Sequence, residues 1–127
     1  MLLLDTHVLL WHLEDSPRLG PLSRERITSG DIASYSAASI WELTIKSMLG
    51  KITLPDGFDA GLQSSQLKEL PVQGSHARAI AEFPELTSHD PFDRLLLAQA
   101  RVTGGTFLTA DGVLLTLGLP FVADARN

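Results

Sequence analysis

The sequence contains no cysteine among its 127 residues. This excludes a disulfide framework, a thiolate metal site and a thiol nucleophile. The absence of disulfides is compatible with the cytosol, and we expect a cytoplasmic protein. Long hydrophobic runs are also missing, because stretches such as Val8–Trp11 and Leu95–Ala98 are far shorter than the roughly 20 residues of a membrane helix. The start of the chain lacks the basic segment of a signal peptide, and Asp5 interrupts its apolar run.

Basic residues are in the minority, with 10 Lys and Arg against 15 Asp and Glu and a formal charge of −5. This balance argues against a protein that binds nucleic acid by bulk electrostatics, which usually needs a basic surface. Five of the acids lie at the predicted strand ends and helices described below. Without these five, the chain has ten acids and ten bases. The excess negative charge is therefore predicted to gather in one pocket.

Glycine and proline residues divide the chain into short apolar runs and segments whose apolar residues recur at helical spacing. Strands are predicted at Leu2–Leu4, Ile32–Ser36, Lys68–Val72, Thr106–Thr109 and Pro120–Val122. Helices are predicted at Thr6–Glu14, Pro21–Ser29, Ala37–Leu49, Phe58–Gln66, Ser75–Phe83, Pro91–Val102 and Gly112–Leu117. This alternation predicts a three-layer α/β/α sandwich around a central parallel sheet of four to five strands. The length suits one domain spanning residues 1–127.

Acidic residues stand where this architecture would bring them together. Asp5 follows the first strand and Asp111 follows the strand at residues 106–109, and ligand sites of open parallel sheets form outside these carboxyl ends. Glu42 lies on the helix after the second strand. Asp90 and Asp93 bracket the start of another helix, where a spacing of three puts both on one face.

Carboxylates that meet in one pocket repel one another, by about 3 kcal/mol per pair at roughly 5 Å and an effective dielectric constant near 20. A hard divalent cation, Mg²⁺ or Mn²⁺, would compensate this repulsion and prefers oxygen ligands. One or two such ions could activate a water molecule and stabilise the charge of an in-line attack on a phosphodiester. The sequence therefore predicts a metal-dependent hydrolase.

Four segments resemble the motifs of PIN-domain ribonucleases, in the order and at the spacing of that family. They are Leu2–Trp11, Ser36–Leu43, His89–Ala100 and Leu108–Asp111. Within the family, the chain is most similar to VapC-type toxins of type II toxin–antitoxin pairs. The resemblance implies a single PIN-like nuclease domain with Mg²⁺-dependent endoribonuclease activity, Mn²⁺ being a possible substitute. It also implies a homodimer that a cognate antitoxin holds inactive.

The resemblance also implies roles for individual residues. Carried over by position, the catalytic and metal-binding acids are Asp5, Glu42, Asp93 and Asp111, and Asp90 is a further acid whose role the family pattern leaves open. Thr6 and Thr109 match positions where the family often has a hydroxyl that can orient water or a carboxylate. Substrate-binding residues and the RNA target are not implied.

Each of these residues also has an ordinary structural explanation. Asp90 and Asp111 are plausible helix N-caps, and Asp93 would be favoured by the helix dipole. Glu42 and Lys46 could form a routine surface pair. The roles of His7 and His89 stay open, with capping or a phosphate contact possible for His89. Trp11 and Trp41 are expected in the core or a dimer interface. Candidates for contact with an RNA backbone are Arg18, Arg24, Arg26, Lys46, Lys51 and Arg94, although Arg94 could instead pair with a nearby acid.

Two other functions compete with the nuclease. An acidic-pocket phosphotransfer module fits poorly, because Asp5-Thr6-His7 lacks the second aspartate of a phosphatase and the last lysine is Lys68, too early for a receiver. A binding module without enzymatic activity, in which the acids only cap helices, is the other alternative.

Overall fold

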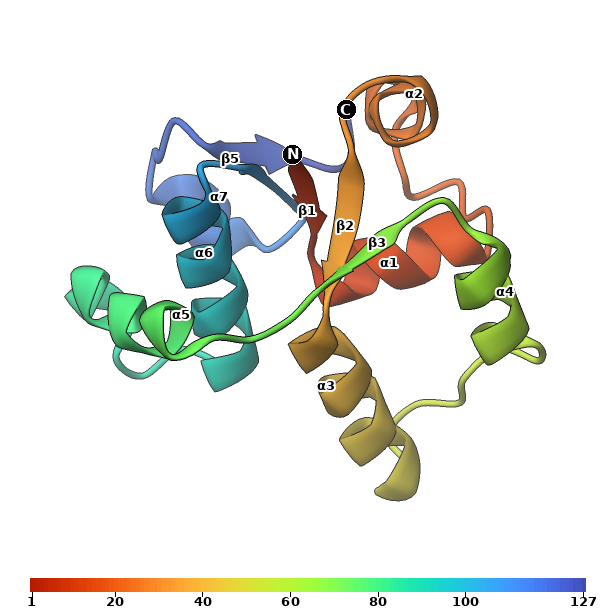
Figure 1. Ribbon diagram of the computed structural model, residues 1–127, viewed down its shortest axis with the longest axis horizontal. Coiled ribbons are helices and arrows are strands. Elements are labelled where there is room, and N and C mark those ends of the chain that lie inside the picture. The colour runs from red at the N-terminus through yellow and green to blue at the C-terminus, as the bar shows by residue number, and fades with distance from the viewer.

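Three consecutive leucines form the central strand of the protein, β1 (Leu2–Leu4), and all three are completely buried. In the computed structural model, which describes residues 1–127, this strand lies in the middle of a five-stranded sheet (Figure 1). The other strands are β2 (Ala33–Ser36), β3 (Lys68–Leu70), β4 (Thr106–Thr109) and β5 (Val122–Asp124). Every pairing is parallel, in the order β3-β2-β1-β4-β5. The predicted parallel sheet is confirmed with five strands.

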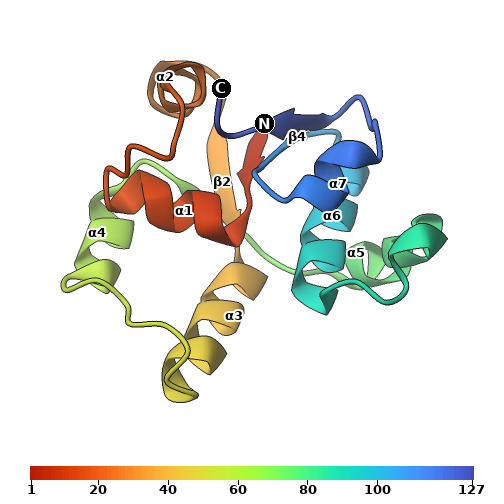
Figure 2. The same cartoon turned by 180° about the vertical axis from the view of Figure 1, so that it is seen from behind.

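Helices cover both faces of this sheet. The helices are α1 (Thr6–Leu13), α2 (Pro21–Ser29), α3 (Ala37–Met48), α4 (Phe58–Ser64), α5 (Gly74–Ala79), α6 (Pro91–Thr103) and α7 (Gly112–Thr116). Figures 1 and 2 show α1, α2 and α4 on one side and α5, α6 and α7 on the other, with α3 continuing from the end of β2. No helix has the length and apolarity that a membrane span requires.

Alternation along β1 divides the core into two parts, because successive side chains of a strand point to opposite faces. Leu2 and Leu4 pack with Val8 and Leu9 of α1 on one face. Leu3 packs on the other face with a separate cluster that includes Leu96 and Leu97 of α6. The three-layer α/β/α sandwich predicted from the sequence is therefore confirmed.

Some predicted boundaries were wrong, and prolines account for two of them. The helix predicted at Ser75–Phe83 ends at Ala79 and continues as a 3₁₀ turn, η1 (Ile80–Glu82), before a second one, η2 (Pro84–Leu86). Phe83 precedes a proline, which disfavours the helical region for its backbone, and it has φ −122° and ψ 65°.

The last strand, predicted at Pro120–Val122, is β5 at Val122–Asp124. Proline has no N–H to donate to the sheet, so pairing begins after it. Smaller shifts occur where β3 stops before Pro71 and α4 stops at Ser64.

The order of the strands defines where a ligand would bind. The chain runs outward from β1 through β2 to β3, and then returns to place β4 on the other side of β1. In open parallel sheets, the crevice for ligands lies at such a switch point, beyond the carboxyl ends of the strands. Asp5 directly follows β1, and Asp111 follows β4 by two residues. The topology thus brings these two acids to the edges of one crevice.

Candidate active site

A pocket of about 520 Å³ lies beyond the carboxyl ends of β1 and β4. All five acids that the sequence motifs selected line it, together with several basic and aromatic side chains. The lining residues are Asp5, His7, Trp11, Arg18, Glu42, Lys46, Asp90, Asp93, Ala110, Asp111 and Arg126. The predicted convergence of carboxylates from distant parts of the chain is therefore observed.

Asp5 is held at the centre of this pocket by hydrogen bonds to both of its oxygens. The side chain caps α1, since Oδ1 accepts a hydrogen bond from the Thr6 backbone N–H at 2.8 Å. The Thr109 hydroxyl donates to Oδ2 at 2.6 Å. Asp5 is only 4% exposed, and this burial raises its pKa even though both hydrogen bonds favour the charged form.

Glu42 is buried rather than part of an exposed surface pair, with 2% of its surface accessible. It lies in the second turn of α3 and points back toward α1, where the Thr6 hydroxyl donates to Oε1 at 2.7 Å. Lys46, one turn later, donates to Oε2. Ser39 Oγ lies 2.9 Å from Thr6 Oγ1 and completes this network. The two carboxylate oxygens thus have fixed partners, which hold the group in one orientation.

Asp90 and Asp111 are helix caps, as their positions before Pro91 and Gly112 suggested. Asp90 Oδ1 accepts from the backbone N–H groups of Phe92 at 2.8 Å and Asp93 at 3.3 Å. Asp111 Oδ1 accepts from Leu114 N–H at 3.1 Å. Because both side chains also line the pocket, capping and site formation occur in the same residues rather than as alternatives. Caps bring helix N-termini to the pocket, where their dipoles favour negative charge.

Crowding and burial in the pocket also act on Asp93. It lies in the first turn of α6, and 18% of its side-chain surface is exposed. Burial raises its pKa to about 8, and the charges of Asp5, Asp90, Asp111 and Glu42 act in the same direction. Without a compensating cation, the pocket therefore keeps a proton on this carboxyl at neutral pH.

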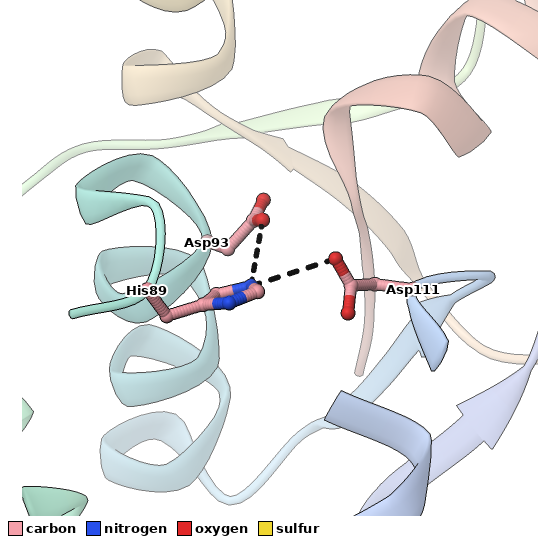
Figure 3. Close-up of side chains that lie close together, drawn as sticks. All are labelled: His89, Asp93 and Asp111. Carbon is pink, nitrogen blue, oxygen red and sulfur yellow. Dashed lines mark ion pairs between the residues drawn. The ribbon is translucent and has the colours of Figure 1, made fainter. Parts of the chain in front are cut away.

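His89 lies between two of the acids, a position that the sequence did not reveal. Figure 3 shows its ring pointing toward Asp93 and Asp111, from a loop that precedes α6. Nε2 is 3.2 Å from Asp93 Oδ2 and 3.5 Å from Asp111 Oδ2. In the sequence, only the four-residue separation of His89 and Asp93 indicated a contact between the two. The contact of His89 with Asp111 depends on the sheet topology.

Three basic side chains, Arg18, Lys46 and Arg126, line the pocket beside the carboxylates. Arg126 had no signal in the sequence; it pairs with Asp124 at 2.8 Å, and its hydrogen bonds lower the pKa of that carboxyl. Of the six basic residues expected near RNA, only Arg18 and Lys46 line this pocket.

The other four candidates lie elsewhere. Arg24 pairs with Asp15, and Arg26 pairs with Asp31. Lys51 is exposed, while Arg94 forms no ion pair with an acid and lines a separate apolar pocket. The suggestion that Arg94 pairs with a nearby acid was therefore wrong.

The largest pocket of the molecule, of about 610 Å³, lies elsewhere and has no comparable cluster of carboxylates. It is lined by the ends of α1 and α2 and the starts of β2 and β3, and its one carboxylate, Asp31, pairs with Arg26. The smaller, acidic pocket is therefore the candidate active site, because its converging titratable side chains, and not its volume, distinguish it.

Comparison with known proteins agrees with this geometry. The family model of the PIN domain matches residues 2–117. The chain belongs to the PIN domain family. No curated protein sequence matches the chain. The matched segment of this PIN domain contains β1 to β4 and all five pocket acids.

Two solved structures share the fold of this PIN domain at low sequence identity. A chain of a toxin–antitoxin complex from Klebsiella pneumoniae superimposes with a TM-score of 0.63 and 14% identity, covering 97% of this chain and 96% of the other. A chain of VapBC2 from Rickettsia felis, bound to a DNA fragment from its promoter, gives a TM-score of 0.70 and 15% identity, with 97% of each chain covered. These matches establish the shared architecture.

The donor set of the PIN pocket fits a divalent metal ion. Several carboxylates converge there, and burial together with the charges of the other acids raises the pKa of Asp93. His89 Nε2 is buried and makes no hydrogen bond. Oxygen donors with one nearby nitrogen are ligands that Mg²⁺ and Mn²⁺ can use in proteins.

We predict that the metal-free protein loses stability as the pH rises from 5 to 8. Asp93 has a pKa of about 8 when folded and 3.8 when unfolded, so only the folded state binds its proton in this range. Each pH unit then lowers the free energy of unfolding by at most about 1.4 kcal/mol. Asp93→Asn should remove this part of the slope and be more stable than wild type at pH 8. Urea unfolding in EDTA at several pH values measures both.

Asp56→Asn is the matched control, because Asp56 is exposed and outside the pocket. It should keep the pH slope of the wild type. An Asp93→Asn protein with an unchanged slope would show that Asp93 does not retain its proton.

Proposed function

We propose that this PIN domain is a Mg²⁺-dependent endoribonuclease and the toxin of a toxin–antitoxin pair, with residues 1–127 acting as a single nuclease domain. The observation that carries the proposal is the convergence of five carboxylates in one pocket at the switch point of the sheet. Membership of the PIN family and the fold shared with toxin–antitoxin structures support it. The expected reaction is hydrolysis of an RNA phosphodiester bond.

The acids of the pocket would hold the metal ion in this proposal. Asp5, Glu42, Asp93 and Asp111 are the principal candidates, and Asp90 is an additional one. A bound divalent cation would supply Lewis acidity to a water molecule and to the phosphate, and Mn²⁺ could replace Mg²⁺. It would also favour the charged form of Asp93, because a nearby positive charge lowers the pKa of a carboxyl.

Two threonines position the acids for this task. Thr109 donates to Asp5 Oδ2, and Thr6 donates to Glu42 Oε1, so each carboxylate has one oxygen fixed by a hydroxyl. Lys46 neutralises part of the charge on Glu42: burial disfavours its ammonium, but hydrogen bonding to Glu42 and the surrounding acids outweigh this and raise the Lys46 pKa. These partners hold the acids in place before substrate binds.

Basic groups beside the acids suit a polyanionic substrate. Arg18, Lys46 and Arg126 line the same pocket, although the chain as a whole is acidic. Cationic side chains of this kind contact phosphates and set the register of a nucleic acid without reading its sequence. A strand that places one phosphate over the carboxylates would bring the neighbouring phosphates near these bases. This arrangement supports RNA as the substrate over a small phosphorylated metabolite.

The partners expected from the sequence are also part of the proposal. Both structural neighbours come from toxin–antitoxin assemblies. We propose a cognate antitoxin for this chain as well, and a small reading frame beside its gene is the observation that would identify it.

A second copy of the chain is the other proposed partner. The outer face of α3 carries apolar residues that lack cover, with Trp41 61% and Met48 83% exposed. Trp41 packs edge-on against Phe92 of α6, with 5.3 Å between ring centroids, beside an apolar pocket. Exposed apolar side chains that share one helix face commonly mark an association site. Trp41 is therefore in the position expected of a dimer-interface residue rather than of a core residue.

We predict that Trp41→Glu disrupts self-association. The new charge would have to be buried in an apolar interface, which disfavours the dimer. Sedimentation velocity at tens of micromolar should show a dimer for wild type and a monomer for this variant. Ile32→Glu, at an exposed apolar residue just before β2 and so at the opposite end of that strand from α3, is the matched control and should stay dimeric. A monomeric wild type, or equal dissociation of both variants, would rule out this interface.

We predict that Asp5→Asn strongly reduces RNA cleavage without unfolding the protein. The amide preserves shape but removes one negative charge, so metal affinity falls while repulsion in the pocket decreases. Cleavage of a mixed RNA substrate in Mg²⁺ should fall by about a hundredfold or more. Thermal unfolding in EDTA should show a midpoint equal to or above that of wild type.

Asp56→Asn again provides the control and should cleave RNA at the wild-type rate. Cleavage by wild type should also stop in EDTA and return with Mg²⁺ or Mn²⁺. A variant at Asp5 that cuts at the normal rate would refute the mechanism. Wild-type protein that neither cleaves RNA nor is stabilised by either ion would favour the binding-module alternative.

A further inference from the structure

His89 is the one nitrogen donor that the structure places between two of the pocket acids. Its Nε2 atom lies 3.2 Å from Asp93 Oδ2 and 3.5 Å from Asp111 Oδ2 (Figure 3). The atom is buried from solvent and makes no hydrogen bond. The imidazole therefore faces the carboxylates without a well-directed partner of its own.

The two distances from His89 Nε2 are close to those between neighbouring ligands of one ion. Two donor atoms that each lie about 2.1 Å from a cation, and subtend about 90–109° at it, are roughly 3.0–3.4 Å apart. One donor atom from each of His89, Asp93 and Asp111 falls within a group whose members are all within 4.8 Å of one another. Small side-chain rotations would then be enough to bring the three atoms to bonding distance.

The three residues also come from elements that the core holds in place. Asp93 is on α6, whose buried residues Leu96 and Leu97 pack against the sheet, and Asp111 caps α7. His89 is tied to η2 through its backbone N–H, which donates to Leu86 O at 2.9 Å. The arrangement is therefore built into the packing around α6 and does not rest on a free loop.

We propose that His89 Nε2 is a ligand of the divalent cation in this pocket, beside Asp93 and Asp111, and that this nitrogen makes the site favour transition-metal ions over Mg²⁺. The proposal rests on the proposed function only for the presence of a bound cation. Mg²⁺ strongly prefers oxygen donors and gives up water reluctantly, whereas imidazole is a good ligand for transition metals. One nitrogen in a carboxylate set therefore shifts the preference toward Mn²⁺ and the ions that follow it in affinity.

The competing explanation is an ion pair, in which a protonated His89 only offsets the charges of Asp93 and Asp111. In that case a metal ion would displace the ring, and no nitrogen would be coordinated. The two explanations therefore differ in whether the histidine nitrogen is bonded to the metal, which spectroscopy can detect without measuring activity.

Pulsed electron paramagnetic resonance of the Mn²⁺-loaded protein tests the proposal directly. Wild type should show electron spin-echo modulation from a coupled ¹⁴N, and labelling of histidine with ¹⁵N should change it to that of ¹⁵N. His89→Gln should lose this coupling. His7→Gln is the matched control, because His7 lines the same pocket beside Asp5, and it should keep the coupling.

Calorimetric titration with each ion adds a second measurement. We expect His89→Gln to weaken Mn²⁺ binding by about tenfold or more and Mg²⁺ binding by clearly less. Mn²⁺ that binds wild type without nitrogen coupling, a coupling that survives in His89→Gln, or equal losses for both ions would overturn the role of His89 alone. Wild type that binds neither ion would overturn the proposed function as well. The labelled wild type shows whether any histidine nitrogen coordinates the ion, and comparison of the two variants assigns the coupling to His89 or His7.

Discussion

Mutual repulsion among carboxylates at one edge of the sheet is the constraint on which this structure depends. Five acids from four separate segments line one pocket, where burial and the charges of the other acids raise the pKa of Asp93 to about 8. The fold tolerates them because four of the five have local compensation. Asp5, Asp90 and Asp111 cap helices, Thr6 and Thr109 donate hydroxyls, and Lys46 pairs with Glu42. The remaining imbalance is what a divalent cation would relieve.

The position of the pocket follows from the sheet. A fully buried β1 requires helices on both faces, and the return of the chain to β4 creates a crevice beside it. Helix N-termini gather at the same edge, because each helix that follows a parallel strand begins there. Asp5, Asp90 and Asp111, which cap these helices, therefore also line the candidate site, and their capping role is compatible with the role proposed for them there.

Much of this could be predicted from the sequence, because local chemistry encodes it. Runs such as Leu2–Leu4 predict buried strands, Asp90-Pro91 predicts a capped helix, and the motif resemblance predicts which acids share a pocket. Contacts between distant segments were harder. The contact of His89 with Asp111 and the presence of Arg126 in the pocket depend on how loops leave the sheet. The burial of Glu42 was also hidden, because its spacing to Lys46 is equally typical of a surface pair.

Anomalous diffraction from crystals of the protein soaked in Mn²⁺ would show whether the five carboxylates hold a divalent cation. We expect a strong anomalous peak within the acidic pocket, bounded by side chains of Asp5, Asp93 and Asp111, that disappears after treatment with EDTA. A peak only at the molecular surface, or clear density with the five carboxylates ordered and no ion among them, would contradict it.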